Sequence, residues 1–202
     1  MKKLILITLS YLFFVSMVTA NQSNLMERAT KQIQEHTEPK FRNTFMIFSK
    51  AEINCLALNV YHEARNESLS GKIAVILVTM NRIADKRFPN TICGVVHQGK
   101  HFLNKRDNKY YPYRDRCQFS WYCDGRTDIP KNKRAWVYSN ALIEYFLKRS
   151  MLFIDFTEGA THYHAGYINL PRWAKNKDFI KTVTIDTHLF YRWEGGKLLA
   201  SR

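Results

Sequence analysis

The segment at residues 68–85 reads SLSGKIAVILVTMNRIAD, and the rest of the chain must pack around it. Its interior at residues 73–78 is apolar on every side of a helix, and a helix without a polar face is buried at the centre of a core. Ser68 and Ser70 are both suited to cap the N-terminus of such a helix. We therefore expect a central core helix that ends near Asp85.

Two further helices are expected, one on each side of this segment along the chain. Residues 49–52 (SKAE) have the Ser-x-x-Glu spacing of a capping box. Apolar residues then recur every three to four positions, which predicts an amphipathic helix ending around Asn66. Another helix is expected over residues 131–149. On one of its faces this helix places Ala135, Tyr138, Leu142, Tyr145 and Phe146.

The C-terminal part of the chain is typical of β structure. Residues 160–165 form a short predicted strand, residues 179–185 alternate branched or aromatic with polar side chains, and residues 188–192 continue the sheet. Residues 88–128 lack clear periodicity, and so long a stretch inside a domain is more often functional than idle. Helices followed by a small antiparallel sheet predict an α+β class and a single domain.

Residues 1–20 have the features of a secretory signal peptide. A basic start precedes an apolar run, and Val18-Thr19-Ala20 offers small residues to a signal peptidase. The competing interpretation is a retained membrane anchor, because the run is close to the lower limit for spanning a bilayer. We expect cleavage and export to the periplasm, the cell wall or the extracellular space. Residues 21–40 then form a short helix and linker, and residues 41–202 form the folded domain.

The four cysteines are Cys55, Cys93, Cys117 and Cys123. An even number in an exported protein indicates two disulfides. Three pairings are possible, and we favour Cys55–Cys93 with Cys117–Cys123. In a chain-entropy estimate these two bridges contribute about 4 and about 2.4 kcal/mol of stability. A zinc site is the competing interpretation, and the lack of a Cys-x2-Cys pair argues against it.

The chain is strongly basic, with 31 Lys and Arg against 17 Asp and Glu. Removing Lys2 and Lys3 with the signal peptide leaves 29 against 17, a net charge of +12. Nucleic acid is the usual partner of so basic a protein. An exported protein instead meets the cell envelope, whose peptide carboxylates, polymers and lipids are anionic. We therefore expect an anionic envelope surface, and not nucleic acid, as a partner.

One carboxylate near the end of the first helix is placed for acid/base chemistry. Glu63 lies in residues 61–67 (YHEARNE), next to a helix face that turns into the core. Desolvation there raises the pKa of a carboxyl group, so that it stays protonated near neutral pH and can donate a proton. The alternative is a simple ion pair of Glu63 with an arginine on the helix surface. Glu67, one turn further, is expected to face solvent.

Several histidines invite a metal-site interpretation. His62-Glu63 resembles the start of the zinc-peptidase motif His-Glu-x-x-His, but position 66 is Asn, so the motif fails. His162 and His164 are two residues apart in a predicted strand and therefore face the same side. Such a pair can bind a metal with a third ligand, hydrogen-bond the hydroxyls of a sugar, or be ordinary surface residues.

Residues 117–123 (CQFSWYC) form a predicted disulfide-closed loop with an amide, a hydroxyl and three aromatic rings. This chemistry suits carbohydrate, because aromatic rings stack on sugar faces while amides meet the hydroxyls. The alternative is a loop whose aromatic rings are buried in the core. The basic and aromatic stretch at residues 105–116 could follow an extended anionic polymer, or be a solvated charged surface.

Five segments in their order along the chain resemble the spore-cortex-lytic-enzyme type of cell wall hydrolase. They are YHEARNE at 61–67, VTMNR at 78–82, CQFSW at 117–121, GATHYH at 159–164 and HLFYR at 188–192.

The likeness covers residues 55–192. It implies a lysozyme-like α+β fold, with residues 41–202 as the catalytic domain, and cleavage of peptidoglycan glycan strands between N-acetylmuramic acid and N-acetylglucosamine. The essential glutamate of the family's Glu-Ala-Arg-x-Glu motif corresponds to Glu63. His62 stands where the family often has glycine, so the surroundings of Glu63 differ.

The resemblance further implies a lytic transglycosylase with Glu63 as its one essential glutamate. We expect it to act on glycan strands as a monomer, without a metal or another cofactor. The remaining side chains expected to contact the sugars, by hydrogen bonds or by stacking, are Gln118, Ser120, Trp121, Thr161, Tyr163 and His164.

Three alternatives remain at this point. A hydrolytic muramidase would use the same site with a second carboxylate, for which Asp124 and Glu67 are candidates. A metal-dependent wall peptidase would use His162 and His164. A wall-binding protein without enzymatic activity is the third.

Overall fold

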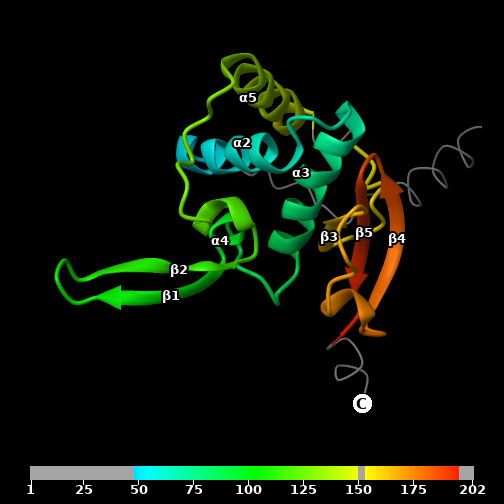
Figure 1. Ribbon diagram of the computed structural model, residues 1–202. Coiled ribbons are helices and arrows are strands. Elements are labelled where there is room, and N and C mark those ends of the chain that lie inside the picture. Colours follow the sequence, from blue (N-terminus) through cyan, green and yellow to red (C-terminus); the bar gives the residue numbers. More distant parts are fainter. Residues whose placement is uncertain (1–47, 150–152, 196–202) are drawn as a thin grey trace, which may run out of the picture. The chain divides into compact units, whose positions relative to one another are not determined.

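The computed structural model describes residues 48–149 and 153–195, which belong to one compact unit (Figure 1). The predicted signal peptide at residues 1–20 and the helix and linker at residues 21–40 lie outside these ranges. In the part of the chain that is described, no helix has the length and apolar character needed to cross a membrane.

The secondary-structure elements follow one another along the chain in a fixed order. They are α2 Lys50–Ala64, α3 Leu69–Ala84, α4 Ile92–Val96, β1 Gly99–Asn104, β2 Lys109–Cys117, the 3-10 helix η1 Ser120–Cys123, α5 Lys133–Lys148, β3 His162–Ala165, the 3-10 helix η3 Trp173–Lys175, β4 Phe179–Ile185 and β5 His188–Trp193.

Helix α3 is the central helix that its apolar sequence predicts. Ser68 caps it by accepting a hydrogen bond from the backbone N–H of Gly71 at 3.2 Å. Val75 belongs to the main core with α2 and α4, whereas Ala74 and Val78 pack into a second cluster with the sheet. Figure 1 shows α3 between α2 and the three-stranded sheet. Burial on both sides explains why this segment has no polar face.

Helix α2 begins where the capping-box spacing predicts, but only half of the box forms. The Ser49 hydroxyl accepts from the backbone N–H of Glu52 at 3.2 Å. The Glu52 carboxylate accepts instead from the backbone N–H groups of Ile92 and Cys93, at 2.8 and 3.3 Å. Glu52 therefore caps the short helix α4 and fixes it against α2.

Helix α5 is present as expected, and the prediction of its buried face is partly wrong. Leu142 and Phe146 are buried in the core. Tyr138 and Tyr145 are exposed, at 47% and 51%, and Ile143 is fully buried in their place. The buried face of α5 is therefore rotated from the predicted one, so that Ile143 faces the core and the two tyrosines face solvent.

The C-terminal sheet has the order β3-β5-β4 with antiparallel neighbours. All three strands were expected from the sequence. The β1–β2 hairpin was not expected, and it lies in the stretch without periodicity. Most residues on both of its faces are exposed, so its sequence lacks the alternation of apolar and polar side chains that marks a half-buried strand. The α+β class is confirmed, although this hairpin precedes α5.

Both predicted disulfides are confirmed, Cys55–Cys93 and Cys117–Cys123. The first joins α2 to α4. The second closes the end of β2 onto η1, which holds the base of the hairpin next to the helical core.

Candidate active site

The site centres on Glu63, near the C-terminal end of α2. Its side chain is partly exposed, and Oε2 accepts a hydrogen bond from the Tyr163 hydroxyl at 2.9 Å. Tyr163 lies on β3, a hundred residues further along the chain. No hydrogen-bond partner for Glu63 Oε1 is found within residues 48–149 and 153–195. One oxygen is thus held in place while the other can exchange a proton with a ligand.

Burial raises the pKa of the Glu63 carboxyl above its ordinary value of 4.5. The hydrogen bond from Tyr163 and the positive charge of Arg82 act in the opposite direction, and burial is the largest effect. None of these influences comes from another carboxylate. The raised pKa is the shift that the sequence predicts for Glu63, and its role as a general acid stays a prediction.

Arg82 comes from α3 and is almost completely buried, with 4% of its surface exposed. Its guanidinium lies over the rings of Phe88 and Phe119, at 5.3 and 5.0 Å from their centroids. Burial lowers the pKa of Arg82 to about 10, and the nearby Tyr163 and Glu63 raise it, so the group stays charged at neutral pH. Its Nη1 has no hydrogen-bond partner in the described part of the chain.

The sequence shows Arg82 as the last residue of the VTMNR segment at 78–82, and did not predict that it belongs to the site. The available signal was a cation at a buried position of an otherwise apolar helix. Such a charge is costly to bury, and its contacts with the Phe88 and Phe119 rings and with the Thr161 carbonyl offset part of that cost.

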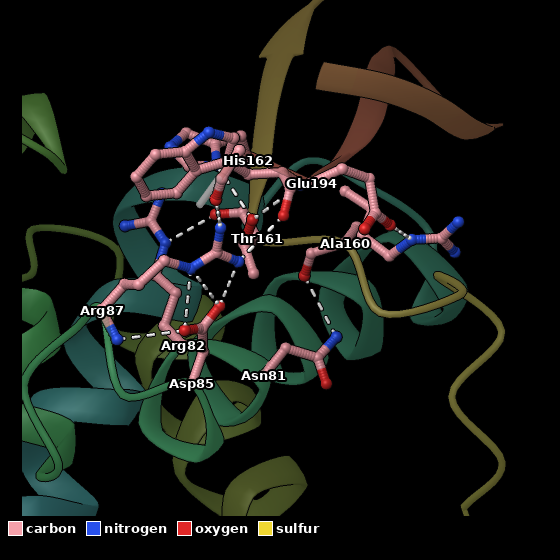
Figure 2. A network of polar contacts seen from close by, with 11 residues as sticks. Asn81, Arg82, Asp85, Arg87, Ala160, Thr161, His162 and Glu194 are labelled. Atoms are coloured by element: carbon pink, nitrogen blue, oxygen red, sulfur yellow. Dashed lines mark hydrogen bonds and ion pairs between the residues drawn. The ribbon is translucent and has the colours of Figure 1, made fainter. Parts of the chain in front are cut away.

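The end of α3 is tied to the segment that leads into β3 (Figure 2). Arg82 Nε donates to the Thr161 carbonyl at 2.6 Å, and the Asn81 amide donates to the Ala160 carbonyl at 3.0 Å. Arg87, just past α3, donates to the Trp193 carbonyl of β5 at 2.8 Å. These contacts fix the start of β3 against the helix, and thereby hold Tyr163 opposite Glu63.

Glu67 does not face solvent, so that prediction is wrong. Its carboxylate accepts from the Thr187 hydroxyl at 2.8 Å and from the Thr187 backbone N–H at 3.2 Å. It also lies 3.9 Å from His188 Nδ1. Glu67 therefore holds the turn between β4 and β5 against the loop that follows α2. The sequence gives no local sign of a partner so far along the chain.

Trp121 is buried, with 8% of its surface exposed. Its indole N–H donates to Asn59 Oδ1 at 3.0 Å, and its ring stacks on His62 at 4.6 Å between centroids. The second His62 contact is between Nε2 and the Asp128 carbonyl at 3.0 Å. His62 thus fills a place beside Glu63 that a glycine would leave open. The burial leaves Trp121 little surface for a sugar ring, and its role in binding stays a prediction.

The other predicted sugar contacts fall into two groups. Gln118 and Ser120 are exposed on either side of the buried Phe119, at the start of η1. Thr161 and His164 are buried, and their side chains already meet other groups of the protein. The Thr161 hydroxyl lies 3.0 Å from His162 Nδ1, and His164 Nε2 lies 3.2 Å from a tyrosine hydroxyl of β5. All four roles in sugar binding stay predictions.

His162 and His164 share one side of β3, as expected. Both rings lie against Trp173, at 5.3 and 5.8 Å between centroids. Burial lowers the pKa of His162 to about 3, with the charges of Arg82 and Arg87 acting in the same direction. Within the described ranges, no group of three or more His, Cys, Asp or Glu side chains is arranged to hold a metal ion. The metal-peptidase alternative therefore lacks its third ligand there.

The chain is similar to several bacterial spore cortex-lytic enzymes. The spore cortex-lytic enzyme of Bacillus cereus is 31% identical over 97 residues, which cover 46% of this chain and 38% of that protein. The enzyme of the same name from Bacillus subtilis is 38% identical over 64 residues, covering 32% of this chain and 21% of that one. This chain thus spans well under half the length of these relatives.

Among solved structures, the catalytic domain of the Bacillus cereus SleB protein is similar at 24% identity, with a TM-score of 0.48. That match covers 75% of this chain and 94% of the other. The catalytic domain of the germination-specific lytic transglycosylase SleB from Bacillus anthracis has 25% identity and a TM-score of 0.47, with 73% and 98% covered.

A family model described as cell wall hydrolase matches residues 66–191. The match includes Arg82 and Tyr163 and begins just after Glu63, so the part played by Glu63 rests on the geometry described above. Because the match spans more than half of the 202 residues, this chain belongs to the cell wall hydrolase family.

Proposed function

We propose that this chain cleaves the glycan strands of peptidoglycan between N-acetylmuramic acid and N-acetylglucosamine, as a lytic transglycosylase with Glu63 as its acid and base. The observation that carries the proposal is the state of Glu63. Its pKa is raised by burial, one of its oxygens is held by Tyr163 at 2.9 Å, and no other carboxylate contributes to that pKa shift.

In the first step, protonated Glu63 donates to the glycosidic oxygen as the bond from that oxygen to C1 of the muramic acid breaks. Positive charge develops on the sugar, as in other glycoside cleavages. The carboxylate then takes the proton of the muramic C6 hydroxyl, whose oxygen attacks C1 and closes a 1,6-anhydro ring. Glu63 ends protonated, no water is consumed, and one residue performs both transfers.

The surroundings of Glu63 support each half of this cycle. Burial favours the protonated carboxyl that begins the reaction. The Tyr163 hydroxyl and the Arg82 charge favour the carboxylate that exists after the first transfer. Because these groups are already in place, little rearrangement is needed when the charge appears. Gln118 and Ser120, exposed beside the site, are proposed to orient the sugars.

The proposal includes export and an envelope substrate. Two disulfides are typical of a protein that works outside the cytoplasm. The net positive charge suits an anionic envelope surface. We further propose that residues 1–20 direct export and that the enzyme acts as a monomer without a metal or another cofactor.

The test compares Glu63→Gln with Glu144→Gln on purified peptidoglycan sacculi. Glu144 is an exposed carboxylate on α5 that pairs with Lys148, so its substitution makes the same chemical change outside the site. We expect Glu63→Gln to lose about 10²–10⁴-fold in rate and Glu144→Gln to keep the original rate. Mass spectrometry of the products should find 1,6-anhydro ends. Full activity of Glu63→Gln overturns the proposal.

The same assay separates the alternatives. Products that carry an added water would identify a hydrolytic muramidase at the same site. Glu67 is engaged with Thr187, and Asp124 accepts from the backbone N–H of Arg126 at 2.8 Å, so both candidate second carboxylates have structural partners. Release of peptide amines and loss of activity in a chelator would identify a peptidase. Binding to sacculi without any cleavage would identify a wall-binding protein.

A further inference from the structure

The β1–β2 hairpin forms one wall of an open groove of about 440 Å³. The facing wall is made by η1 and the residues that follow it. Three aromatic and two cationic side chains are prominent in the lining. They are Phe102, Tyr111, Tyr122, Arg114 and Arg126. The groove thus combines apolar ring faces with positive charge, outside the immediate surroundings of Glu63.

The aromatic rings of the hairpin are exposed although nothing in the fold requires them there. Phe102 and Tyr111 are 39% and 40% exposed, and their ring centroids are 6.2 Å apart across the two strands. A two-stranded ribbon gains little stability by itself. Exposed apolar rings gathered on one face are more often a contact surface than a structural need.

The hairpin is also basic. Residues 99–117 contain six Lys or Arg and two Asp. Arg114 lies against Gly125, which has a φ of +79° and where a Cβ atom would come within 3.3 Å of the guanidinium Nε. The ion pair of Arg114 with Asp115 is 3.8 Å long and exposed, so it contributes little and can exchange for another anion.

The groove is fixed to the helix that carries Glu63. Tyr122 in its wall follows Trp121, whose ring stacks on His62 at 4.6 Å, and His62 precedes Glu63. At the base of the hairpin, the Gln118 backbone N–H donates to the Gln98 carbonyl at 2.8 Å, next to the Cys117–Cys123 disulfide. The η1 wall and the base of the hairpin are therefore fixed relative to the helix that carries Glu63.

We propose that this groove binds a second stretch of peptidoglycan, beyond the bond cut at Glu63, with sugar faces on Phe102 and Tyr111 and peptide carboxylates paired with Arg114 and Arg126. This inference rests on the proposed function, because it extends the same substrate along the protein. A basic groove with aromatic rings can also hold single-stranded nucleic acid. Peptidoglycan is favoured because the chain belongs to the cell wall hydrolase family. It is also favoured because η1 both lines the groove and contacts His62 beside Glu63.

The test measures co-sedimentation of the full chain, carrying Glu63→Gln to prevent cleavage, with intact sacculi and with glycan strands stripped of their peptides by an amidase. Phe102→Ser is compared with Leu103→Ser, because Leu103 is similarly exposed, at 44%, and does not line the groove. Arg114→Gln with Arg126→Gln is compared with Lys105→Gln and Arg106→Gln. The second pair removes the same charge at the exposed hairpin turn.

We expect Phe102→Ser to weaken binding to both substrates about fivefold to tenfold. The groove arginine pair should weaken binding to intact sacculi by at least as much, and binding to stripped strands by less, because these strands keep only the lactyl carboxylate that the amidase frees. Both control variants should bind like the parent chain. Circular dichroism of all variants verifies the fold.

Equal losses in the groove variants and their controls would overturn the proposal, since they would indicate a general charge effect. So would unchanged binding in the groove variants. If the groove substitutions weaken binding of a single-stranded oligonucleotide and leave binding of sacculi unchanged, the occupant of the groove is nucleic acid. Cleavage of short soluble peptidoglycan oligomers by the chain with Glu63 intact is measured in parallel. If the oligomers are not cleaved but binding still depends on the groove, the proposed function is refuted and the groove proposal is not. If they are cleaved but binding does not depend on the groove, the groove proposal is refuted and the proposed function is not.

Discussion

Tyr163→Phe tests the hydrogen bond on which the character of Glu63 depends. The Tyr163 hydroxyl donates to Glu63 Oε2 at 2.9 Å, and this contact favours the carboxylate over the protonated acid. A hydrogen bond to a charged group contributes about 1.5–3 kcal/mol. One pKa unit corresponds to about 1.4 kcal/mol. The hydroxyl can also donate to the protonated carboxyl, where such a bond contributes about 0.5–1.5 kcal/mol. Only the difference, about 1–1.5 kcal/mol, affects the pKa, so removal of the hydroxyl is expected to raise the pKa of Glu63 by about one unit.

The consequence is read from the pH dependence of kcat/KM on soluble peptidoglycan oligomers. Glu63 must be protonated to donate, so activity is lost as the pH rises through its pKa. In Tyr163→Phe this alkaline limb should move upward by about one pH unit. The maximal rate should fall as well, because the carboxyl loses its orientation and the carboxylate formed after proton donation is less stable.

Tyr191→Phe is the matched control. It removes a buried tyrosine hydroxyl from the neighbouring strand β5, where the partner is His164 at 3.2 Å and not Glu63. Its alkaline limb should stay where it is in the unsubstituted enzyme. If the limb of Tyr163→Phe does not move, or moves to lower pH, the assignment of Glu63 as the acid held by Tyr163 is refuted.

Three further changes test the electrostatics and the scaffold. Because burial raises the folded-state pKa of Glu63 above 4.5, this group costs stability progressively as the pH rises from 4.5 to that raised value, and the full cost remains at higher pH. Glu63→Gln should therefore melt at a higher temperature than the unsubstituted chain near pH 7 and at a similar one near pH 4; equal midpoints near pH 7 would contradict this. Joint replacement of Cys55 and Cys93 by Ser, which opens a bridge with a sequence separation of 38, should lower the free energy of unfolding by about 4 kcal/mol in urea. Equal stability with and without the bridge would exclude it as a major contributor. Trp121→Phe leaves Asn59 Oδ1 without its indole donor in the core and should cost about 1–3 kcal/mol by the same measurement, and an unchanged midpoint would argue against that contact.

Local patterns predicted most of the helices and the C-terminal sheet. The apolar run at residues 73–78 predicted α3, because a helix that is apolar on every side can only be buried in the core. The alternation over residues 179–185 predicted β4 for a similarly local reason. Glu63 could be proposed because a carboxylate beside a core-facing helix surface is desolvated whatever the rest of the fold.

What the sequence could not predict depends on contacts between distant residues. Glu67 has its partner 120 positions further along the chain, so its local surroundings suggested solvent. Tyr163 was predicted to stack on a sugar, and the structure places its hydroxyl on Glu63. Arg82 has a local signal, a cation inside an apolar helix, but its interactions with Glu63 and Thr161 depend on the packing of α2, α3 and β3.

The hairpin escaped prediction for another reason. Leu103 and Tyr110, at 44% and 72% exposure, face solvent as Phe102 does on the other side, so no buried face marks the strands. An alternation of apolar and polar residues arises when one face of a strand is buried. A ribbon that projects from the core has no such buried face, so its sequence lacks the alternation.

That projection also makes the hairpin an exchangeable part. Its attachment to the rest of the protein is concentrated at one end, where Cys117–Cys123 and the backbone bond between Gln118 and Gln98 join it to the helical core. Lengthening, shortening or replacing the ribbon beyond that point would leave the packing around α3 unchanged. With the groove binding as proposed, grafting a new ribbon would change which polymer the groove holds, while Glu63 and the buried residues around it stay the same.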